Sequence, residues 1–266
     1  MNARSKAITL MWWNRRWGSD ITHMLAVIDA VDPDVLFLFE SMMRPSDPSA
    51  CPDSIVRAHL GSTYFHSNML VAERKDGTQE VTSVYARHFL KPRQCIGSTL
   101  STGGRFATRQ SQRVLVELAI QLPETSTRIR LGAVHLSYGW PLFNRVRIAS
   151  ELHQIKAWYY ESLEPVIFAG DFNTPPQVSA GFESYGRTFS MDDLIIPGGQ
   201  PRRYGSEQSA HASCAILPLR DHGLARCIDY GFGNASGRAL VRLCVLGDRG
   251  PSNHRPLIMQ IGTPGA

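Results

Sequence analysis

The sequence lacks long apolar runs, and this excludes helices that cross a membrane. A run such as Val35–Phe39 is far shorter than the ~20 apolar residues that a helix needs to span a bilayer. The apolar stretch Ile8–Trp13 follows Arg4 and Lys6, but Asn14 ends it before it could serve as the core of a signal peptide. We therefore expect a cytoplasmic protein with no membrane partner.

The sequence also lacks paired cysteines. No two of them form a Cys-x-x-Cys pair, and their number is odd, which argues against a zinc site and against a complete disulfide framework. Buried thiols in a reducing compartment fit this pattern best. The cysteines are Cys51, Cys95, Cys214, Cys227 and Cys244.

No linker, internal repeat or low-complexity block interrupts the chain. With 43% hydrophobic and 19% charged residues, the composition is that of an ordinary globular protein, so we expect a single domain over residues 1–266. The net charge of +5 favours a polyanionic partner, although many basic proteins bind no nucleic acid. We expect a monomer.

Apolar periodicity predicts many strands and few long helices. The helix at Asp20–Val31 has Ser19 or Asp20 as its cap, and the helix at Phe143–Glu161 has one apolar side. That side consists of Val146, Ala149, Leu152, Ile155 and Tyr159. Strands are expected at Ile8–Trp13, Val35–Phe39, Met69–Ala72, Val81–Tyr85, Val114–Leu122, Ile129–Leu136, the run into Asp171, Cys227–Phe232, Leu240–Leu246 and Pro256–Ile261. This order of elements indicates a sheet-rich α/β sandwich.

One apolar run ends in a pattern that suggests chemistry. Pro165–Ala169 leads into Gly170, and Asp171 and Asn173 follow on either side of Phe172. Alternate residues of a strand share a face, so the carboxylate and the amide can point into one site while Phe172 points into the core. A strand that simply ends in an Asx turn is the alternative.

With Asn173 included, six positions besides Asp171 support the site interpretation. Taken singly, an acid such as Glu40 is more often solvated, and a histidine such as His135 more often belongs to a hydrogen-bonded core. Several polar residues that close apolar runs are harder to dismiss, because site residues gather at strand ends in α/β folds. Together with Asp171, the residues are Asn14, Glu40, His135, Asn173, Asp229 and His254.

The motifs around these residues resemble those of the endonuclease/exonuclease/phosphatase superfamily, the metal-dependent phosphodiesterases similar to deoxyribonuclease I and exonuclease III. They are Trp13-Asn14, Leu38-Phe39-Glu40 (with Phe39 in place of the usual Gln), Val134-His135-Leu136, Gly170-Asp171-Phe172-Asn173, Ile228-Asp229-Tyr230-Gly231-Phe232 and Ser252-Asn253-His254-Arg255-Pro256. Their order and spacing match the superfamily along nearly the whole chain. The resemblance implies an α/β fold, a four-layer sandwich of two packed, mostly antiparallel sheets flanked by helices.

The resemblance also implies roles for single residues. Glu40 is expected to hold Mg²⁺ or Mn²⁺, with Asn14 orienting its ligand sphere. Asp171 is expected to position or deprotonate the attacking water. Asn173 and His135 would hold phosphate oxygens, and His254 would contact the phosphate while Asp229 fixes its tautomer.

Asn253 departs from the pattern, because the superfamily has an Asp there that helps to hold metal. An amide keeps the shape but removes a negative charge. Natural tolerance, an engineered inactivating substitution, and a chain that binds without cleaving all fit this difference.

Basic residues suggest a substrate surface. Residues 91–113 contain no acid and several glycines, so we expect a flexible basic loop that contacts a phosphate backbone, with a solvated surface loop as the alternative. Its candidate contacts are Arg105, Arg109 and Arg113, and Trp17 could stack on a base if it is exposed.

The sequence therefore predicts a metal-dependent phosphodiesterase, a nuclease that cleaves DNA or RNA, with DNA favoured. Two alternatives stay open. One is a phosphatase on a small phosphoester such as an inositol phosphate, and the other is a weakened nucleic-acid-binding module, suggested by Asn253.

Overall fold

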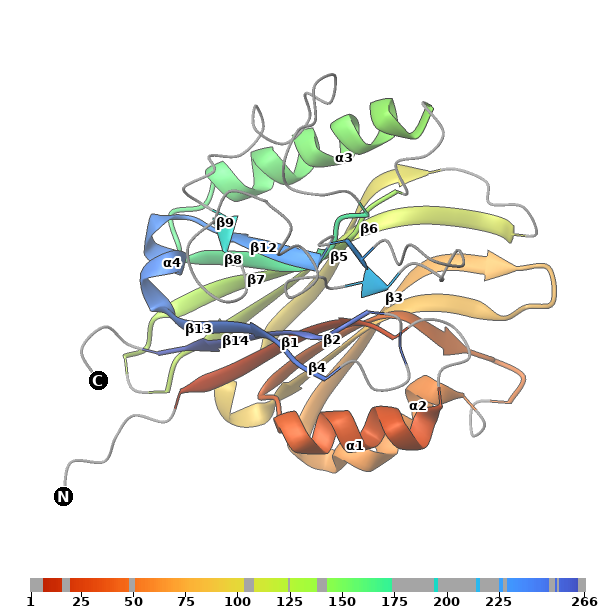
Figure 1. Ribbon diagram of the computed structural model, residues 1–266, viewed down its shortest axis with the longest axis horizontal. Coiled ribbons are helices and arrows are strands. Elements are labelled where there is room, and N and C mark those ends of the chain that lie inside the picture. Colours follow the sequence, from red (N-terminus) through yellow and green to blue (C-terminus); the bar gives the residue numbers. More distant parts are fainter. Residues whose placement is uncertain are drawn as a thin grey trace.

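The structure is a computed structural model that describes residues 7–15, 20–47, 51–102, 108–123, 125–137, 143–173, 194–195, 214–215, 225–226, 229–248, 252 and 254–262. Figure 1 shows its strands in the middle, with helices on two opposite sides. None of the described helices is long and apolar enough to cross a membrane.

The strands form two halves, which we call the first and the second sheet. The first sheet has the order β13 (Val241–Leu246), β14 (Leu257–Ile261), β1 (Ile8–Asn14), β2 (Val35–Met43), β4 (Gln79–Arg87) and β3 (Tyr64–Arg74). The second has β6 (Thr108–Gln121), β7 (Arg128–His135), β8 (Val166–Asp171), β12 (Asp229–Gly233) and β9 (Leu194–Ile195), with β5 (Arg93–Thr102) on the free side of β6. A separate ribbon pairs β10 (Cys214–Ala215) with β11 (Ala225–Arg226).

The two sheets are joined along one edge. The start of β6 pairs with the end of β3, where Ser111 lies opposite Ala72, and the rest of β6 pairs with β5 and β7. Among the described strands only the pairs β1–β2 and β7–β8 run parallel. The strands are therefore mostly antiparallel, as predicted, and the two sheets are halves of one sheet that curls over on itself.

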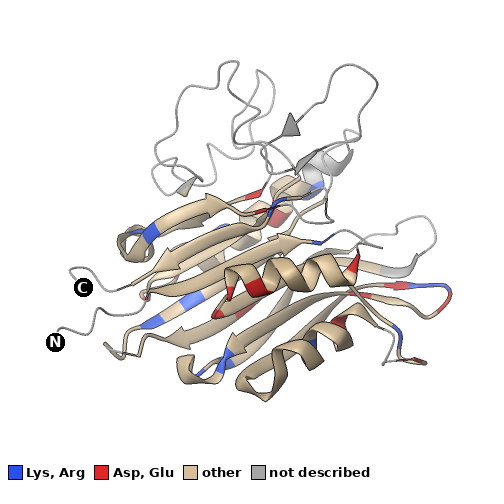
Figure 2. Ribbon diagram, turned by 60° about the horizontal axis from the view of Figure 1, so that its bottom comes forward, with Lys and Arg blue, Asp and Glu red and all other residues tan. Residues whose placement is uncertain are grey.

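The main core lies between the sheets. On β6, Val114, Val116, Leu118 and Ile120 are all buried in this core, as their alternation predicts. Strand β2 is buried on both faces, which explains its continuous apolar run: Phe37 faces the inner core, where it stacks on Trp12 at 5.5 Å. In Figure 2 most of the strand length carries no charged residue.

Helices cover the outer faces and complete the four layers. Helix α1 (Ile21–Val31) and helix α2 (Pro52–Leu60) pack on the first sheet, and α3 (Phe143–Tyr160) packs on the second (Figure 1). As predicted, Asp20 caps α1 by accepting hydrogen bonds from backbone N–H groups. Helix α4 (Ala235–Leu240) and the short 3₁₀ turns η2 (Gly61–Thr63) and η3 (His88–Leu90) complete the described elements.

Several local predictions were wrong. Residues 93–102 form β5 and residues 108–113 belong to β6, so most of the predicted basic loop is strand. Strand β5 escaped notice because it is largely exposed and lacks apolar alternation. Gly97 lies within β5, where a Cβ would come within 2.7 Å of the sulfur of Met69. It allows close packing rather than loop flexibility.

The helices also differ in detail from the prediction. Ile148 is buried on α3, whereas Ala149 is exposed. Helices α2 and α4 were not predicted, because both are short and each buries only one large apolar side chain, Val56 in α2 and Leu240 in α4.

Candidate active site

Strand register brings three of the predicted residues into one row. Asp171 lies opposite His135 in the β7–β8 pair and opposite Asp229 in the β8–β12 pair. Paired residues share a face of the sheet, so the side chains converge. Phe172 and Tyr230 point the other way and stack at 4.2 Å in the core beneath α3. The alternation that motivated the site interpretation is therefore present.

Asn14 connects this row to the first sheet. Its Nδ2 donates to Oδ2 of Asp171 at 3.1 Å and to Oε1 of Glu40 at 3.2 Å. Asn14 is the last residue of β1, and Glu40 belongs to the neighbouring strand β2. One amide thus links two carboxylates from opposite sheets.

A β-bulge directs Glu40 into the site. Strand β2 was predicted to end before Glu40, but it continues to Met43 after a register shift between Leu38 and Ser41. Glu40 has φ 54°, a left-handed conformation that is uncommon for residues other than glycine. Bulges of this kind reorient a side chain next to functional sites.

Gly170 is required by the close approach of the strands. Its φ is 148°, and a Cβ at this position would lie 1.9 Å from the carbonyl oxygen of Val134 and 2.9 Å from Cζ of Phe39. Any larger residue would push β8 away from β7. The glycine that precedes Asp171 therefore keeps Asp171 in register with His135.

His254 approaches the row from the C-terminal segment. Its Nδ1 lies 2.9 Å from Oδ2 of Asp229, and its Nε2 lies 3.7 Å from Oδ2 of Asp171. Ser252 ties this segment to β1, because its hydroxyl donates to the carbonyl of Asn14 at 2.6 Å and accepts from the N–H of His254. His135 closes the group, with Nε2 3.7 Å from Asp171 and 3.8 Å from Glu40.

Asn173 takes part in a turn as well as in the site. Its backbone N–H donates to Oδ1 of Asp171 at 2.8 Å, which is the Asx turn considered as an alternative. Its side-chain Nδ2 donates to the carbonyl of Leu136 at 2.8 Å. The turn and the site interpretation are thus compatible.

A sequence profile described as "Endonuclease/Exonuclease/phosphatase family" matches residues 11–254, a range that includes each strand-end residue of the site. The chain belongs to this family. No curated protein sequence gives a significant match to this family member.

Solved structures of the family share the fold. An endonuclease/exonuclease/phosphatase from Beutenbergia cavernae matches with a TM-score of 0.75 and 18% identity over 97% of this chain and 72% of its own. TDP2 from D. rerio, complexed with a single-strand DNA product, matches with a TM-score of 0.67 and 16% identity over 97% and 100%. The human Nocturnin catalytic domain with a bound sulfate anion gives 0.63 and 15% over 96% and 94%.

Burial shapes the electrostatics of this family member's site. Asp171 is 1% exposed, and burial raises its pKa to about 7; the charge of His254 opposes this rise and that of Asp229 adds to it. Arg15, directly after Asn14, is also 1% exposed. Burial lowers the pKa of its guanidinium, and the nearby charge of Glu40 opposes that shift.

A buried acidic and imidazole cluster fits a divalent cation. Asp171, Asp229 and His254 each offer a ligand atom, and these atoms lie within 4.8 Å of one another. Two carboxylate oxygens suit hard cations such as Mg²⁺ or Mn²⁺, and imidazole suits the transition metals. The predicted ligands Glu40 and Asn14 lie next to this set, since Nδ2 of Asn14 donates to Oδ2 of Asp171 and to Oε1 of Glu40.

The structure does not bring the remaining predicted residues, the substrate contacts and Asn253, into this cluster among the residues that it describes. Arg113 is buried at 7% exposure in β6, opposite Ser101 of β5. Arg109 lies on β6, but its side chain is outside the description. Arg105, Trp17 and the metal candidate Asn253 lie outside the described residues.

Sequence reasoning missed two buried residues near the site. Ser252 was named only as part of a motif, and Arg15 was given no role. No periodicity marks a polar side chain that is buried to hold a neighbour. Its role becomes visible only through contacts between segments distant in sequence.

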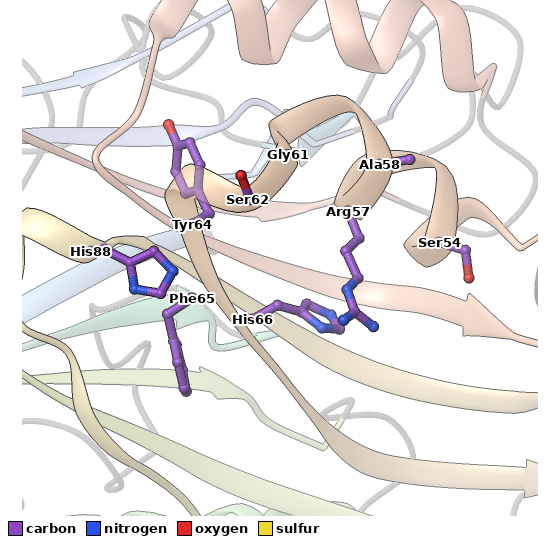
Figure 3. Close-up of a pocket in the computed structure, with 9 residues that line it drawn as sticks. All are labelled: Ser54, Arg57, Ala58, Gly61, Ser62, Tyr64, Phe65, His66 and His88. Atoms are coloured by element: carbon purple, nitrogen blue, oxygen red, sulfur yellow. The ribbon is translucent and has the colours of Figure 1, made fainter.

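A pocket of about 530 Å³ lies apart from the cluster. It is formed by α2, η2, β3 and η3, and Figure 3 shows Arg57, His66 and His88 among the side chains that line it. None of the strand-end site residues contributes to its lining. The candidate active site is therefore the acidic and histidine cluster and not this pocket.

Proposed function

We propose that this family member is a divalent-metal-dependent phosphodiesterase that hydrolyses nucleic acid, with DNA as the favoured substrate. The observation that carries the proposal is the convergence of Asp171 with Asp229, His254 and His135 at the ends of neighbouring elements. Acids and histidines in mutual contact can move a proton and hold an anion, which hydrolysis of a phosphodiester requires.

The site residues divide this work. Asp171 accepts a proton from the attacking water, as a carboxylate that lies beside two imidazoles can do. Asp229 holds Nδ1 of His254, so that Nε2 is directed toward Asp171 and the phosphate. His135 donates to a phosphate oxygen as negative charge builds there.

Asp171, Asp229 and His254 are the residues that would hold the cation, with Glu40 beside them. When bound, such a cation supplies neutralisation of phosphate charge and a more acidic water. The net charge of +5 supports a polyanionic substrate. The DNA product in the TDP2 structure and the sulfate in the Nocturnin structure also support ligands of this kind.

The test is cleavage of a panel by the purified chain. Plasmid DNA, single-stranded DNA, short RNA and an inositol phosphate are each incubated with Mg²⁺ or Mn²⁺. Cleavage of DNA is expected. Turnover of the inositol phosphate alone would show a phosphatase and not a nuclease. Binding of DNA without cleavage would favour the alternative of a nucleic-acid-binding module.

Asp171→Asn tests the assignment of the base. The amide cannot accept the proton, so we expect activity to fall by about 10²–10⁴-fold while the protein stays folded. Asp29→Asn, an exposed acid paired with His59, is the matched control and should keep wild-type activity. Retention of more than about a tenth of the activity in Asp171→Asn would exclude Asp171 as the base.

A further inference from the structure

Helix α3 buries a carboxylate that the proposed chemistry does not use. Glu151 has no exposed surface, and in the described part of the chain it makes no ion pair. A buried carboxylate without a cation is costly unless hydrogen-bond donors surround it. Here neutral donors from two other segments surround the carboxylate of Glu151. Its hydrogen bonds therefore connect α3 to both segments.

The first of these segments directly follows His135. Oε2 of Glu151 accepts from the backbone N–H of Ser137 at 2.9 Å, and Oε1 accepts from the hydroxyl of the same serine at 2.6 Å. The second segment is the end of β5, where the hydroxyl of Ser101 donates to Oε1.

The segment 135–137 is held from its other side by the site itself. The N–H of Leu136 donates to the carbonyl of Asp171 at 2.9 Å, and the carbonyl of Leu136 accepts from Nδ2 of Asn173 at 2.8 Å. Residues 135–137 thus lie between the Asp171 turn and Glu151. A shift of Ser137 toward or away from α3 would move His135 and the acceptor of Asn173 together.

We propose that Glu151 is a positioning residue that fixes the segment 135–137 and so sets the places of His135 and Asn173. It touches no reacting group. The inference rests on the proposed function only in that its effect on turnover presupposes hydrolysis. The required property is hydrogen-bond acceptance from Ser137, not negative charge, because each donor to the carboxylate among the described residues is neutral.

Two substitutions at this position separate acceptance from charge. Glu151→Met keeps the approximate volume but leaves the N–H of Ser137 without its acceptor. Glu151→Gln can keep an oxygen toward that N–H and turn its NH₂ toward the two serine hydroxyls, which accept hydrogen bonds. We expect kcat to fall by roughly 10–100-fold in Glu151→Met, since a displacement of about 1 Å can cost 10²-fold, and to stay within about threefold in Glu151→Gln.

Gln154→Ala is the matched control on the same helix. Nε2 of Gln154 donates to the carbonyl of Leu100 in β5 at 2.6 Å, and in the described part of the chain no hydrogen bond joins Gln154 to residues 135–137. This variant should keep wild-type kcat. The midpoint of the metal titration should not change in any of these variants, because the candidate ligands come from other elements.

A measurement without turnover keeps this inference separate from the proposed function. In ¹⁵N-labelled, metal-free protein, the ring resonances of His135, assigned through His135→Gln, should shift in Glu151→Met and not in Gln154→Ala. If the wild type cleaves no phosphoester, the proposed function fails while this test still stands.

Three outcomes would overturn the inference. A folded Glu151→Met with wild-type kcat and unchanged His135 resonances would show that the segment needs no anchor. If Gln154→Ala lowers kcat as much as Glu151→Met does, the contribution of α3 is to support β5 and not to position the segment 135–137. If Glu151→Met does not fold, Ser137→Ala and Ser101→Ala take its place. Only Ser137→Ala should then shift the ring resonances of His135 and lower kcat. If Ser101→Ala has these effects and Ser137→Ala does not, the proposal is refuted.

Discussion

Oδ2 of Asp229 lies 2.9 Å from Nδ1 of His254, and both side chains are buried. A carboxylate in this position keeps the proton on Nδ1, which leaves Nε2 directed toward Asp171 at 3.7 Å. Asp229 thus sets the tautomer of an imidazole that lies 25 residues further along the chain.

We predict that Asp229→Asn lowers kcat by about 10–100-fold, the usual effect of removing the partner that orients a functional histidine. The variant is compared with the wild type in kcat and in the midpoint of a Mn²⁺ titration. A lower kcat at an unchanged midpoint assigns Asp229 to orientation. A strongly raised midpoint would assign it to the metal, as its place among Asp171 and His254 also allows.

The second prediction concerns the metal and Glu40. Chelator should abolish activity and Mg²⁺ or Mn²⁺ should restore it, while circular dichroism shows a folded protein throughout. Glu40→Gln should raise the metal concentration required for half-maximal activity, because an anion beside the cation is lost. Glu161→Gln, an exposed acid at the end of α3, is the control. Full activity in excess chelator would refute the metal mechanism.

The third prediction concerns stability at low pH. Burial alone would raise the pKa of Asp53, but hydrogen bonds from His66, Ser83, Tyr85 and Asn68 outweigh it and lower the pKa to about 2. The unfolded chain binds this proton near pH 3.8, so the folded state gains stability above that pH and loses it as the pH falls toward 2. The contribution is about 2 kcal/mol.

Asp53→Asn should therefore lower the free energy of unfolding at pH 7 and flatten its decline between pH 4 and about 2. Urea denaturation at a series of pH values measures both effects, with Asp29→Asn as the exposed control. A variant with the same pH dependence as the wild type would show that another group controls acid unfolding.

The fold and most of the site were predictable because they depend on alternation and on strand ends. An apolar strand that ends at Asp171 places its carboxylate beside His135 whenever the two strands run parallel and in register. The four layers follow from strands buried on both faces and helices that are apolar on one face.

Other features could not be predicted, because they depend on contacts between distant segments. The bulge that directs Glu40 inward leaves the apolar pattern of β2 unchanged. Strand β5 is an exposed edge whose residues need no alternation, and it was mistaken for a loop. Glu151 resembles any charged residue of a helix until Ser137 and Ser101 are placed against it.

The last prediction concerns Asn253, which stands where the motif that this chain resembles has an aspartate. If the amide is a natural weakening of a metal site, Asn253→Asp should tighten metal binding, because a further anion near the cation adds direct or water-mediated attraction. The midpoint of a Mg²⁺ titration of activity should then move to lower concentration, and the rate at saturating metal should rise or stay the same.

The possible results of this substitution separate the three explanations for Asn253. If the residue is an inactivating change, Asn253→Asp should turn activity on from almost nothing. If neither the wild type nor Asn253→Asp cleaves any phosphoester, the alternative of a nucleic-acid-binding module without cleavage is supported. A lower rate at unchanged metal affinity would contradict the weakening account altogether. It would mean that the amide of Asn253 donates a hydrogen bond to a phosphate oxygen. A carboxylate cannot donate this bond and would repel the phosphate.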